Sequence, residues 1–291
     1  MSKKVLITGT SSGFGYLATK VLLDKGYTVV ATMRASSGRN QGPADELRAL
    51  GAHVVDIDVA DDASVESGVQ KALELAGGLD IVINNAGAGG LGIQELFTID
   101  DWRWQFEVNV FGTQRMNRAV LPTLRAQGHG LIVYLSSIVA RLTFPFFGPY
   151  AASKAALESM AETYRVEYSR LGIDSVVIEP GGYATGFQAS MRSPSDSERA
   201  ASLGEYAHAP AAQIKGFEDA FKGPNAPSPN MVADALVKLI ETEPGQRPFR
   251  TVVDGMGLEE PITQYNDKGA EVLQATFGNW GMADALKLKI D

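Results

Sequence analysis

The stretch TGTSSGFG, residues 8–15, closes the first apolar run of the chain and precedes its first helix-like pattern. It can be interpreted in two ways. Small residues between a strand and a helix can form a loop that holds phosphate, because N–H groups at a helix start carry the positive end of the helix dipole. The same letters contain the pattern G-x-S-x-G, which in hydrolases presents a nucleophilic serine, here Ser11.

The pattern of apolar residues outside this loop predicts the fold. Short β-branched runs recur between Gly, Asp or Pro residues, as is typical of strands, and apolar residues three or four positions apart separate them, as in helices. Strands that are apolar at nearly every position need cover on both faces. We therefore expect the α/β class, a doubly wound Rossmann-type parallel sheet of about seven strands with helices on both faces. The expected strands are 4–8, 27–32, 53–57, 79–84, 131–135, 174–179 and 249–253.

One domain, residues 1–291, is expected to hold all of these elements. The stretch from Gly181 to Pro229 is rich in Ser, Ala, Gly and Pro and is too long for an ordinary connection. We interpret it as a partly helical substrate lid around 183–228, with a plain surface elaboration as the alternative. A regular helix is expected over 231–241, followed by a C-terminal appendage from about residue 255.

Composition excludes several classes of function. The chain has 34 acidic and 26 basic residues, a formal charge of -8, which argues against nucleic acid and anionic membranes as partners. It has no cysteine, so disulfides and thiolate sites are excluded, and Asp, Glu and His show no metal-ligand clustering, so no metal is expected. The first apolar run, Val5 to Ile7, is too short for a signal peptide or a membrane span, which predicts a cytoplasmic protein.

A serine hydrolase built on Ser11 would need a carboxylate and then a histidine later in the chain. The sequence offers only His53, inside an expected strand, His129, in a Gly-flanked turn, and His208, in the presumed lid. The phosphate loop is therefore the favoured interpretation, with hydroxyls of the two serines binding phosphate or capping the helix.

Three further motifs follow at the ends of later strands. Asn-Asn-Ala-Gly occupies 84–87, Ser-Ser occupies 136–137, and Tyr-Ala-Ala-Ser-Lys occupies 150–154. Together with residues 8–15, and over about 3–185, they resemble the short-chain dehydrogenase/reductase family. The resemblance implies an enzyme that transfers hydride between a nicotinamide cofactor and a carbonyl or alcohol substrate.

The last of these motifs has a chemistry of its own. Tyr150 and Lys154 are four positions apart and so share one helix face, where the ammonium, with an oxidised nicotinamide, is expected to lower the tyrosine pKa from about 10. Tyr150 would then exchange a proton with the substrate oxygen while Ser137 donates a hydrogen bond to it. The resemblance adds Asn109, holding a water that relays protons to Lys154; a buried asparagine that satisfies backbone groups is the alternative.

The end of the second expected strand indicates which dinucleotide binds. Met33 and Arg34 stand where an acidic residue would bind the ribose hydroxyl of NAD. Arg34, Ser36 and Ser37 can instead bind a 2′-phosphate, and no carboxylate follows until Asp45, so we expect nothing nearby to repel it. NADP(H) is therefore preferred over NAD(H).

The remaining cofactor contacts are implied by the resemblance. Asp58 and Val59 would contact the adenine, residues 85–87 its ribose, and the Pro180–Thr185 segment the nicotinamide carboxamide. Alternative interpretations are that the asparagine pair at 84–85 braces the sheet and that the Pro-Gly pair only ends a strand. The full set of expected cofactor-binding residues is Gly9, Ser11, Ser12, Gly13, Phe14, Gly15, Arg34, Asp58, Val59, Asn85, Ala86, Gly87, Tyr150, Lys154, Pro180, Gly181 and Thr185.

Apolar side chains near the expected site favour an apolar or aromatic ketone or aldehyde, although each could equally be packing. They are Leu91, Ile93, Leu96, Leu142, Phe144, Phe146, Phe147, Tyr183, Phe187 and Met191. Arg141 is an isolated charge among them that is solvated, salt-bridged or directed at an acidic group on the substrate. The resemblance also implies a homo-oligomer, a dimer or tetramer, built on helices near 101–127 and 150–170. The alternative to an enzyme is a sensor that binds NADP(H) without turnover.

Overall fold

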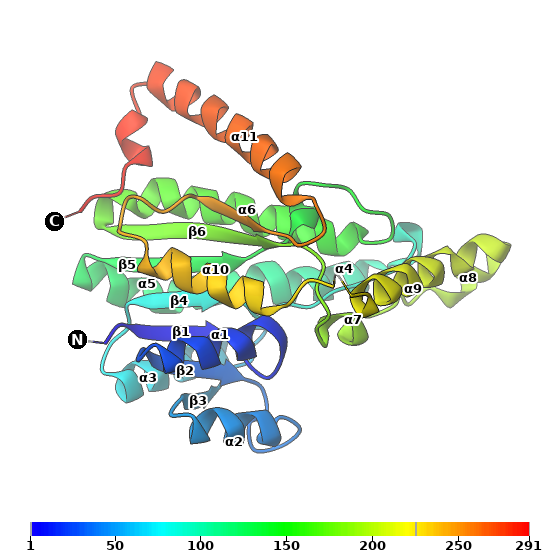
Figure 1. Cartoon of the computed structure of the whole chain (residues 1–291), viewed down its shortest axis with the longest axis horizontal. Coiled ribbons are helices and arrows are strands. Elements are labelled where there is room, and N and C mark those ends of the chain that lie inside the picture. The colour runs from blue at the N-terminus through cyan, green and yellow to red at the C-terminus, as the bar shows by residue number, and fades with distance from the viewer. Residues whose placement is uncertain (1, 225, 291) are drawn as a thin grey trace.

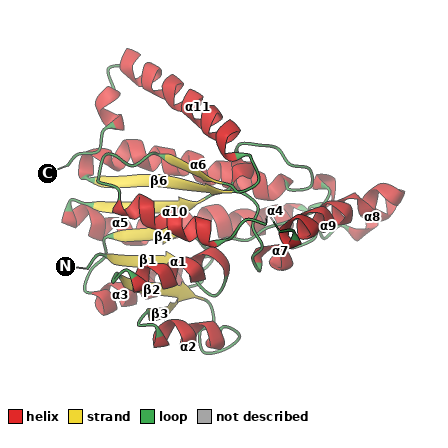
Figure 2. Ribbon diagram, viewed as in Figure 1, coloured by secondary structure: helices red, strands yellow, loops and turns green. Residues whose placement is uncertain are grey.

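The computed structural model describes residues 2–224 and 226–290 and contains one seven-stranded parallel sheet in the order β3-β2-β1-β4-β5-β6-β7 (Figure 1). Helices cover both faces of this sheet (Figure 2), which confirms the single-domain Rossmann-type fold. Every expected strand is present, with ends shifted by at most two residues. The strands are β1 (Lys4–Thr8), β2 (Thr28–Met33), β3 (His53–Asp56), β4 (Ile81–Asn84), β5 (Gly130–Leu135), β6 (Ile173–Pro180) and β7 (Arg250–Val253).

The strands form because nearly every side chain is buried, and successive side chains enter opposite cores. In β1, Val5 and Ile7 pack on α1 and α10, whereas Leu6 packs on α3 and α5. All eight residues of β6 are buried. The α-helices are α1 (Gly13–Asp24), α2 (Gln41–Ala49), α3 (Asp62–Ala76), α4 (Ile99–Phe106), α5 (Gly112–Gln127), α6 (Gly148–Tyr168), α7 (Phe187–Ser190), α8 (Ser197–Ser202), α9 (Ala209–Lys222), α10 (Asn230–Glu241) and α11 (Glu259–Asn279).

The order of the strands places the candidate site. The chain runs outward from β1 to β3 and then crosses to β4 on the other side of β1, so the loops after β1 and β4 diverge and leave a crevice between them. The TGTSSGFG stretch follows β1 and enters α1 at Gly13, at the rim of this crevice.

The described residues of 183–228 lie beyond the carboxyl ends of the strands and include the α-helices α7 to α9, on the right of Figure 1, and the 3-10 helix η5 (Gly204–His208). The segment is attached to α4: the Arg192 guanidinium lies 3.9 Å from the Trp104 ring centroid, and Ser195 donates hydrogen bonds to Asp101 from its N–H (3.1 Å) and hydroxyl (2.7 Å).

The segment from residue 255 onward consists mainly of α11, which stands away from the body of the molecule in Figure 1. It is buried through Ile262, packed on Ile138 and Val252, and through Asn266. Over residues 2–224 and 226–290 no helix combines the length and apolarity needed to cross a membrane.

Candidate active site

A cavity of about 600 Å³ opens at the carboxyl ends of the strands and gathers residues from widely separated parts of the sequence. Of the site residues expected from the sequence, Gly15 and Asn109 lie outside its lining. The others all line it: Gly9, Ser11, Ser12, Gly13, Phe14, Arg34, Asp58, Val59, Asn85, Ala86, Gly87, Ser137, Tyr150, Lys154, Pro180, Gly181 and Thr185.

Two glycines of the loop, Gly9 and Gly15, are packed so closely that a side chain would not fit there. At Gly9 the backbone is left-handed (φ 71°), and a Cβ would lie 2.8 Å from the Ala86 Cα. At Gly15 a Cβ would collide with the Asn85 amide and lie 2.6 Å from the Gly9 carbonyl oxygen. The Asn85 amide donates to the carbonyls of Thr8 (2.8 Å) and Gly9 (3.0 Å), so this asparagine braces the loop.

Asn84, the other member of the asparagine pair, also braces the structure through its side chain. Its amide donates to the Asn117 Oδ1 at 3.0 Å in the core between β4 and α5. Asn84 also pairs with Tyr134 of β5, and the Asn85 N–H donates to the Thr8 Oγ1 at 3.0 Å, so the pair braces the sheet through backbone groups as well as through side chains.

The start of α1 fits the phosphates of a dinucleotide. Ser12 is the residue before the helix, and its hydroxyl makes no capping hydrogen bond. The N–H groups of the first turn of α1, at the cavity wall, therefore have no side-chain cap. The small residues bring this backbone to the cavity wall. Ser11 lies beside it, and none of the described residues that line the cavity is a histidine, so the surroundings of Ser11 lack the base that a hydrolase requires.

The end of β2 differs from expectation. An Arg34 guanidinium nitrogen lies 3.6 Å from the Asp58 Oδ2, so the prediction that no carboxylate lies near Arg34 is wrong. The prediction considered neighbours in sequence, whereas the loops after β2 and β3 meet in space because these strands pair. Ser36 is turned away from the cavity: its N–H and hydroxyl donate to Asp56 at 2.7 and 2.8 Å.

Two residues near Arg34 were missed by sequence reasoning. Arg39 and Asn40 line the cavity where Ser36 and Ser37 were expected, and the Asn40 amide donates to the Arg34 carbonyl at 2.6 Å. A basic residue in the turn after β2 was the available signal, but the pattern did not indicate that the turn bends back toward the cavity.

Tyr150 and Lys154 project from the first two turns of α6, which begins with Gly148 and Pro149. These turns lie beside the end of β5. They are 8% and 5% exposed, and the Lys154 Nζ lies 5.8 Å from the Tyr150 ring centroid and donates to the Leu135 carbonyl at 2.6 Å. Ser137 lies beside Tyr150 and lowers the pKa of its hydroxyl, and its own hydroxyl donates to the Pro180 carbonyl at 3.4 Å. The tyrosine, lysine and serine are therefore brought together.

The pKa values of this group are governed by burial. Burial raises the pKa of Tyr150 to about 12, against the lowering effect of Ser137. Burial also lowers the pKa of Lys154 to about 8, against the raising effect of the Glu158 charge. In the protein by itself the tyrosine pKa is thus raised, because burial of the hydroxyl dominates, and the expectation of a lowered pKa in the presence of an oxidised nicotinamide stays a prediction.

Asn109 lies in a π-helical turn, η2 (Glu107–Phe111), between α4 and α5. Its Oδ1 accepts from the Ala88 N–H at 2.8 Å, and its amide donates to the Ala88 carbonyl at 3.0 Å and to the Ser153 hydroxyl at 2.9 Å. The alternative of a buried asparagine that satisfies backbone groups describes these contacts.

The segment after β6 is fixed from two sides. The Gly181 N–H donates to the Val253 carbonyl at 2.8 Å, and a Cβ at Gly181 would collide with Asp254. The Thr185 hydroxyl and N–H each lie 3.4 Å from the Gln188 Oε1, at the entrance to α7. This segment therefore both ends the strand and lines the cavity.

The half of the cavity next to α7 and α9 is mainly apolar, with Gln188 and Ser190 as polar residues of α7. Five of the expected lining residues are present there, and Val139 and Phe217 and Phe221 of α9 were not anticipated. The five that line it are Phe144, Phe147, Tyr183, Phe187 and Met191, whereas Leu91, Ile93, Leu96, Leu142 and Phe146 do not. The spacing of Ile214, Phe217 and Phe221 by three and four residues was the available signal for a helix with one apolar face.

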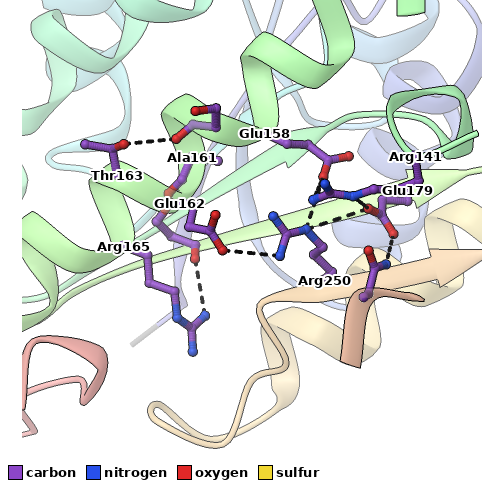
Figure 3. A network of polar contacts seen from close by, with 11 residues as sticks. Arg141, Glu158, Ala161, Glu162, Thr163, Arg165, Glu179 and Arg250 are labelled. Atoms are coloured by element: carbon purple, nitrogen blue, oxygen red, sulfur yellow. Dashed lines mark hydrogen bonds and ion pairs between the residues drawn. The ribbon is translucent and has the colours of Figure 1, made fainter. Parts of the chain in front are cut away.

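Arg141 does not line the cavity and is salt-bridged. Its guanidinium pairs with Glu158 and, at 3.3 Å, with Glu179 (Figure 3). The alternative that it binds an acidic group of the substrate is therefore not supported. Among residues 2–224 and 226–290, His, Asp and Glu form no group of three that could hold a metal ion.

Comparison with known proteins places this geometry in a family. Residues 3–196 match the family described as short chain dehydrogenase. The chain is 39% identical over 194 residues to the uncharacterized oxidoreductase YusZ of Bacillus subtilis, covering 64% of this chain and 67% of that protein. It is 32% identical over 249 residues to a 3-ketodihydrosphingosine reductase of Bacteroides thetaiotaomicron, covering 86% and 87%.

A solved structure shares the whole fold. A short-chain dehydrogenase/reductase of Burkholderia phymatum, in complex with NAD, superposes with a TM-score of 0.75 at 25% identity and covers 94% of this chain and 95% of that one. The matching sequence, the sheet order and the Ser–Tyr–Lys cluster beside a glycine loop all agree with the family that the sequence motifs resemble. The chain belongs to the short-chain dehydrogenase/reductase family and is an oxidoreductase.

Proposed function

We propose that the protein is an NADPH-dependent carbonyl reductase that acts through Ser137, Tyr150 and Lys154. The observation that carries the proposal is that Ser137, Tyr150 and Lys154 line one cavity together with the glycine loop, with the Lys154 Nζ 5.8 Å from the Tyr150 ring centroid. The bound nicotinamide would supply the hydride.

Each side chain has a distinct task in this reaction. The Ser137 hydroxyl donates a hydrogen bond to the carbonyl oxygen, where negative charge develops. The Tyr150 Oη gives its proton to the same oxygen. Because burial raises the tyrosine pKa to about 12, the hydroxyl carries its proton at neutral pH, which suits reduction. Lys154 contributes positive charge beside the Tyr150 ring, which favours the phenolate left after proton transfer.

NADP(H) as the preferred dinucleotide rests on the end of β2. Arg34 and Arg39 line this part of the cavity and can bind a 2′-phosphate, which would take the place of Asp58 beside Arg34. The similar Burkholderia phymatum structure holds NAD, so the proposal depends on these residues of the present chain. The remaining dinucleotide contacts are proposed as the sequence implies, with Asp58 and Val59 at the adenine.

The proposed substrate is an apolar or aromatic ketone or aldehyde. Val139, Phe144, Phe187, Met191 and Phe217 line the substrate half of the cavity, and no charged side chain does so among the described lining residues next to α7 and α9. The name of the relative from Bacteroides thetaiotaomicron denotes reduction of a ketone. We further propose that residues 183–228 close over this half as a lid.

The test is turnover. Purified protein is expected to oxidise NADPH with members of a panel of apolar ketones and aldehydes, and Tyr150→Phe is expected to lower kcat by about 10³-fold or more while the Kd for NADPH stays unchanged. Tyr206→Phe, an exposed tyrosine of the lid segment, serves as the control and should keep full activity. Binding of NADPH without turnover of any substrate would instead indicate a dinucleotide sensor.

We also propose a homo-oligomer, a dimer or tetramer, that associates through α4–α5 and α6. Phe111 at the start of α5 is 50% exposed and Ile99 at the start of α4 is 66% exposed, as expected for residues that a second copy would cover. Light scattering on the purified protein measures this directly, and a monomer at micromolar concentration would contradict it.

A further inference from the structure

Helix α6 faces three consecutive residues at the end of β5 with side chains spaced one turn apart. Tyr150 lies beside Ser137 in the cavity, and Lys154 donates to the Leu135 carbonyl at 2.6 Å. One turn further along, Glu158 Oε1 accepts a hydrogen bond from the Ser136 hydroxyl at 2.7 Å. The third contact fixes the residue that precedes Ser137, and the reaction proposed above does not use it.

Glu158 is a buried charge, 1% exposed, within an ionic network (Figure 3). Arg141 pairs with it, and the Arg250 Nε lies 3.1 Å from its Oε2. Arg250 also pairs with Glu162, one turn along α6, at 3.3 Å. The second buried carboxylate, Glu179, pairs with the same two arginines at 3.3 and 3.8 Å. Two guanidinium groups thus oppose the two buried carboxylates, so the Glu158 charge is compensated where it stands.

This placement gives Glu158 an electrostatic effect on Lys154. The two residues are four apart on one helix, and the negative charge of Glu158 raises the pKa of Lys154, which burial lowers to about 8. The charged groups facing Glu158 are Arg141, Arg250, Glu179 and Glu162, together with Lys154 itself.

We propose that Glu158 is a positioning residue, which holds the Ser136–Ser137 strand end against α6 and places a negative charge one helical turn from Lys154. The inference rests on the proposed function, because it assigns Glu158 a task through Ser137 and Lys154. It does not require that Glu158 touch substrate or cofactor. Glu158 acts through a hydrogen bond on one neighbour and through charge on the other.

The charge effect is tested with Glu158→Gln against Glu162→Gln. Both changes remove a carboxylate from Arg250, but among the described residues only Glu158 accepts a hydrogen bond from the Ser136 hydroxyl. The readout is the Lys154 pKa from NMR of protein labelled with ¹³C at lysine Cε, assigned by the resonance that Lys154→Met lacks. Glu158→Gln should lower this pKa by about one unit and Glu162→Gln should not. This readout needs no substrate, so it stands or falls separately from the proposed reductase activity.

The positioning effect is tested by turnover. Glu158→Gln should move the alkaline fall of the reduction rate about one pH unit lower, in step with Lys154. Ser136→Ala removes the hydrogen bond and leaves the charge, so it should lower kcat about tenfold with the alkaline limb in place. Ser136→Ala also tests the positioning effect if Glu158→Gln fails to fold. An unchanged Lys154 pKa in Glu158→Gln, or an unchanged kcat in Ser136→Ala, would overturn the inference.

Discussion

Gly15 offers a direct test of the glycine loop. A Cβ at this position would lie 2.6 Å from the Gly9 carbonyl oxygen and collide with the Asn85 amide. Gly15→Ala must therefore shift the loop, and we expect a free energy of unfolding lower by about 1–3 kcal/mol and a Kd for NADPH raised at least about tenfold. Urea denaturation and fluorescence titration measure the two effects.

The matched control for this substitution is Gly42→Ala in α2, where a Cβ would meet no atom within 4 Å. It should leave both quantities nearly unchanged or stabilise α2 slightly. If Gly15→Ala binds NADPH as tightly as the unmodified protein, the loop does not approach the cofactor as proposed.

Arg34 and Asp58 make the cofactor preference testable. Arg34→Ala removes a charged partner for the 2′-phosphate, so the Kd for NADPH should rise about 10- to 100-fold while that for NADH stays constant. Asp58→Asn frees Arg34 from its 3.6 Å ion pair and keeps a side-chain oxygen that can accept from the adenine amino group, so it should tighten NADPH binding. Titrations with both dinucleotides measure this, with Arg103→Ala, an exposed arginine of α4, as the control. An equal loss of NADH affinity would remove Arg34 from the phosphate site.

The proposed lid is attached to α4 through side chains of Arg192 and Ser195. The Arg192 guanidinium lies 3.9 Å from the Trp104 ring centroid, a contact worth about 0.5–2 kcal/mol. Arg192→Ala should shift the lid toward open conformations and raise the KM for the carbonyl substrate about three- to tenfold, with the Kd for NADPH unchanged. Steady-state kinetics measure the KM, and Arg125→Ala, at an exposed position of α5, is the control. A KM that does not change would mean that the attachment does not limit closure.

The elements differ in how far the sequence predicted them. The strands were predicted to within two residues because burial on both faces demands continuous apolar runs, as in β6. The helices α7 to α9 were expected only as a partly helical lid, since α7 and α8 are too short to show a period, and the helical spacing of Ile214, Phe217 and Phe221 in α9 was not used. The π-helical turn around Asn109 has no pattern in sequence either.

The site follows the same division. Tyr150, Lys154 and Ser137 could be predicted because local spacing places them on one helix face and at one strand end. The ion pair of Arg34 with Asp58 could not, because it joins loops that meet only when the sheet forms. The raised tyrosine pKa also escaped prediction, since burial is a property of the folded chain.

At the scale of the whole molecule, Lys154 lowers the stability of the protein that contains it. Its pKa falls from 10.5 to about 8 on folding, so between these pH values the unfolded chain binds the proton and the folded chain does not. Stability should therefore rise with pH over this window, by roughly 3 kcal/mol relative to Lys154→Met.

Urea denaturation of cofactor-free protein and of Lys154→Met at half-unit steps from pH 7.5 to about 10.5 measures the difference. Below pH 8 both states bind the proton, so the difference between the two proteins should be constant there. A difference that is constant across the entire range would show that the ammonium is not desolvated.

The contacts of Tyr150, Lys154 and Glu158 with the end of β5 also restrict the length of the chain. Each residue added to an α-helix turns everything after it by about 100°. A one-residue insertion or deletion between Tyr150 and Glu158 would swing Glu158 away from Ser136 while Tyr150 stayed in place. We therefore expect this interval to tolerate exchange of its outward-facing residues but no change in their number, whereas the segment between α8 and α9 can gain or lose residues without disturbing β5.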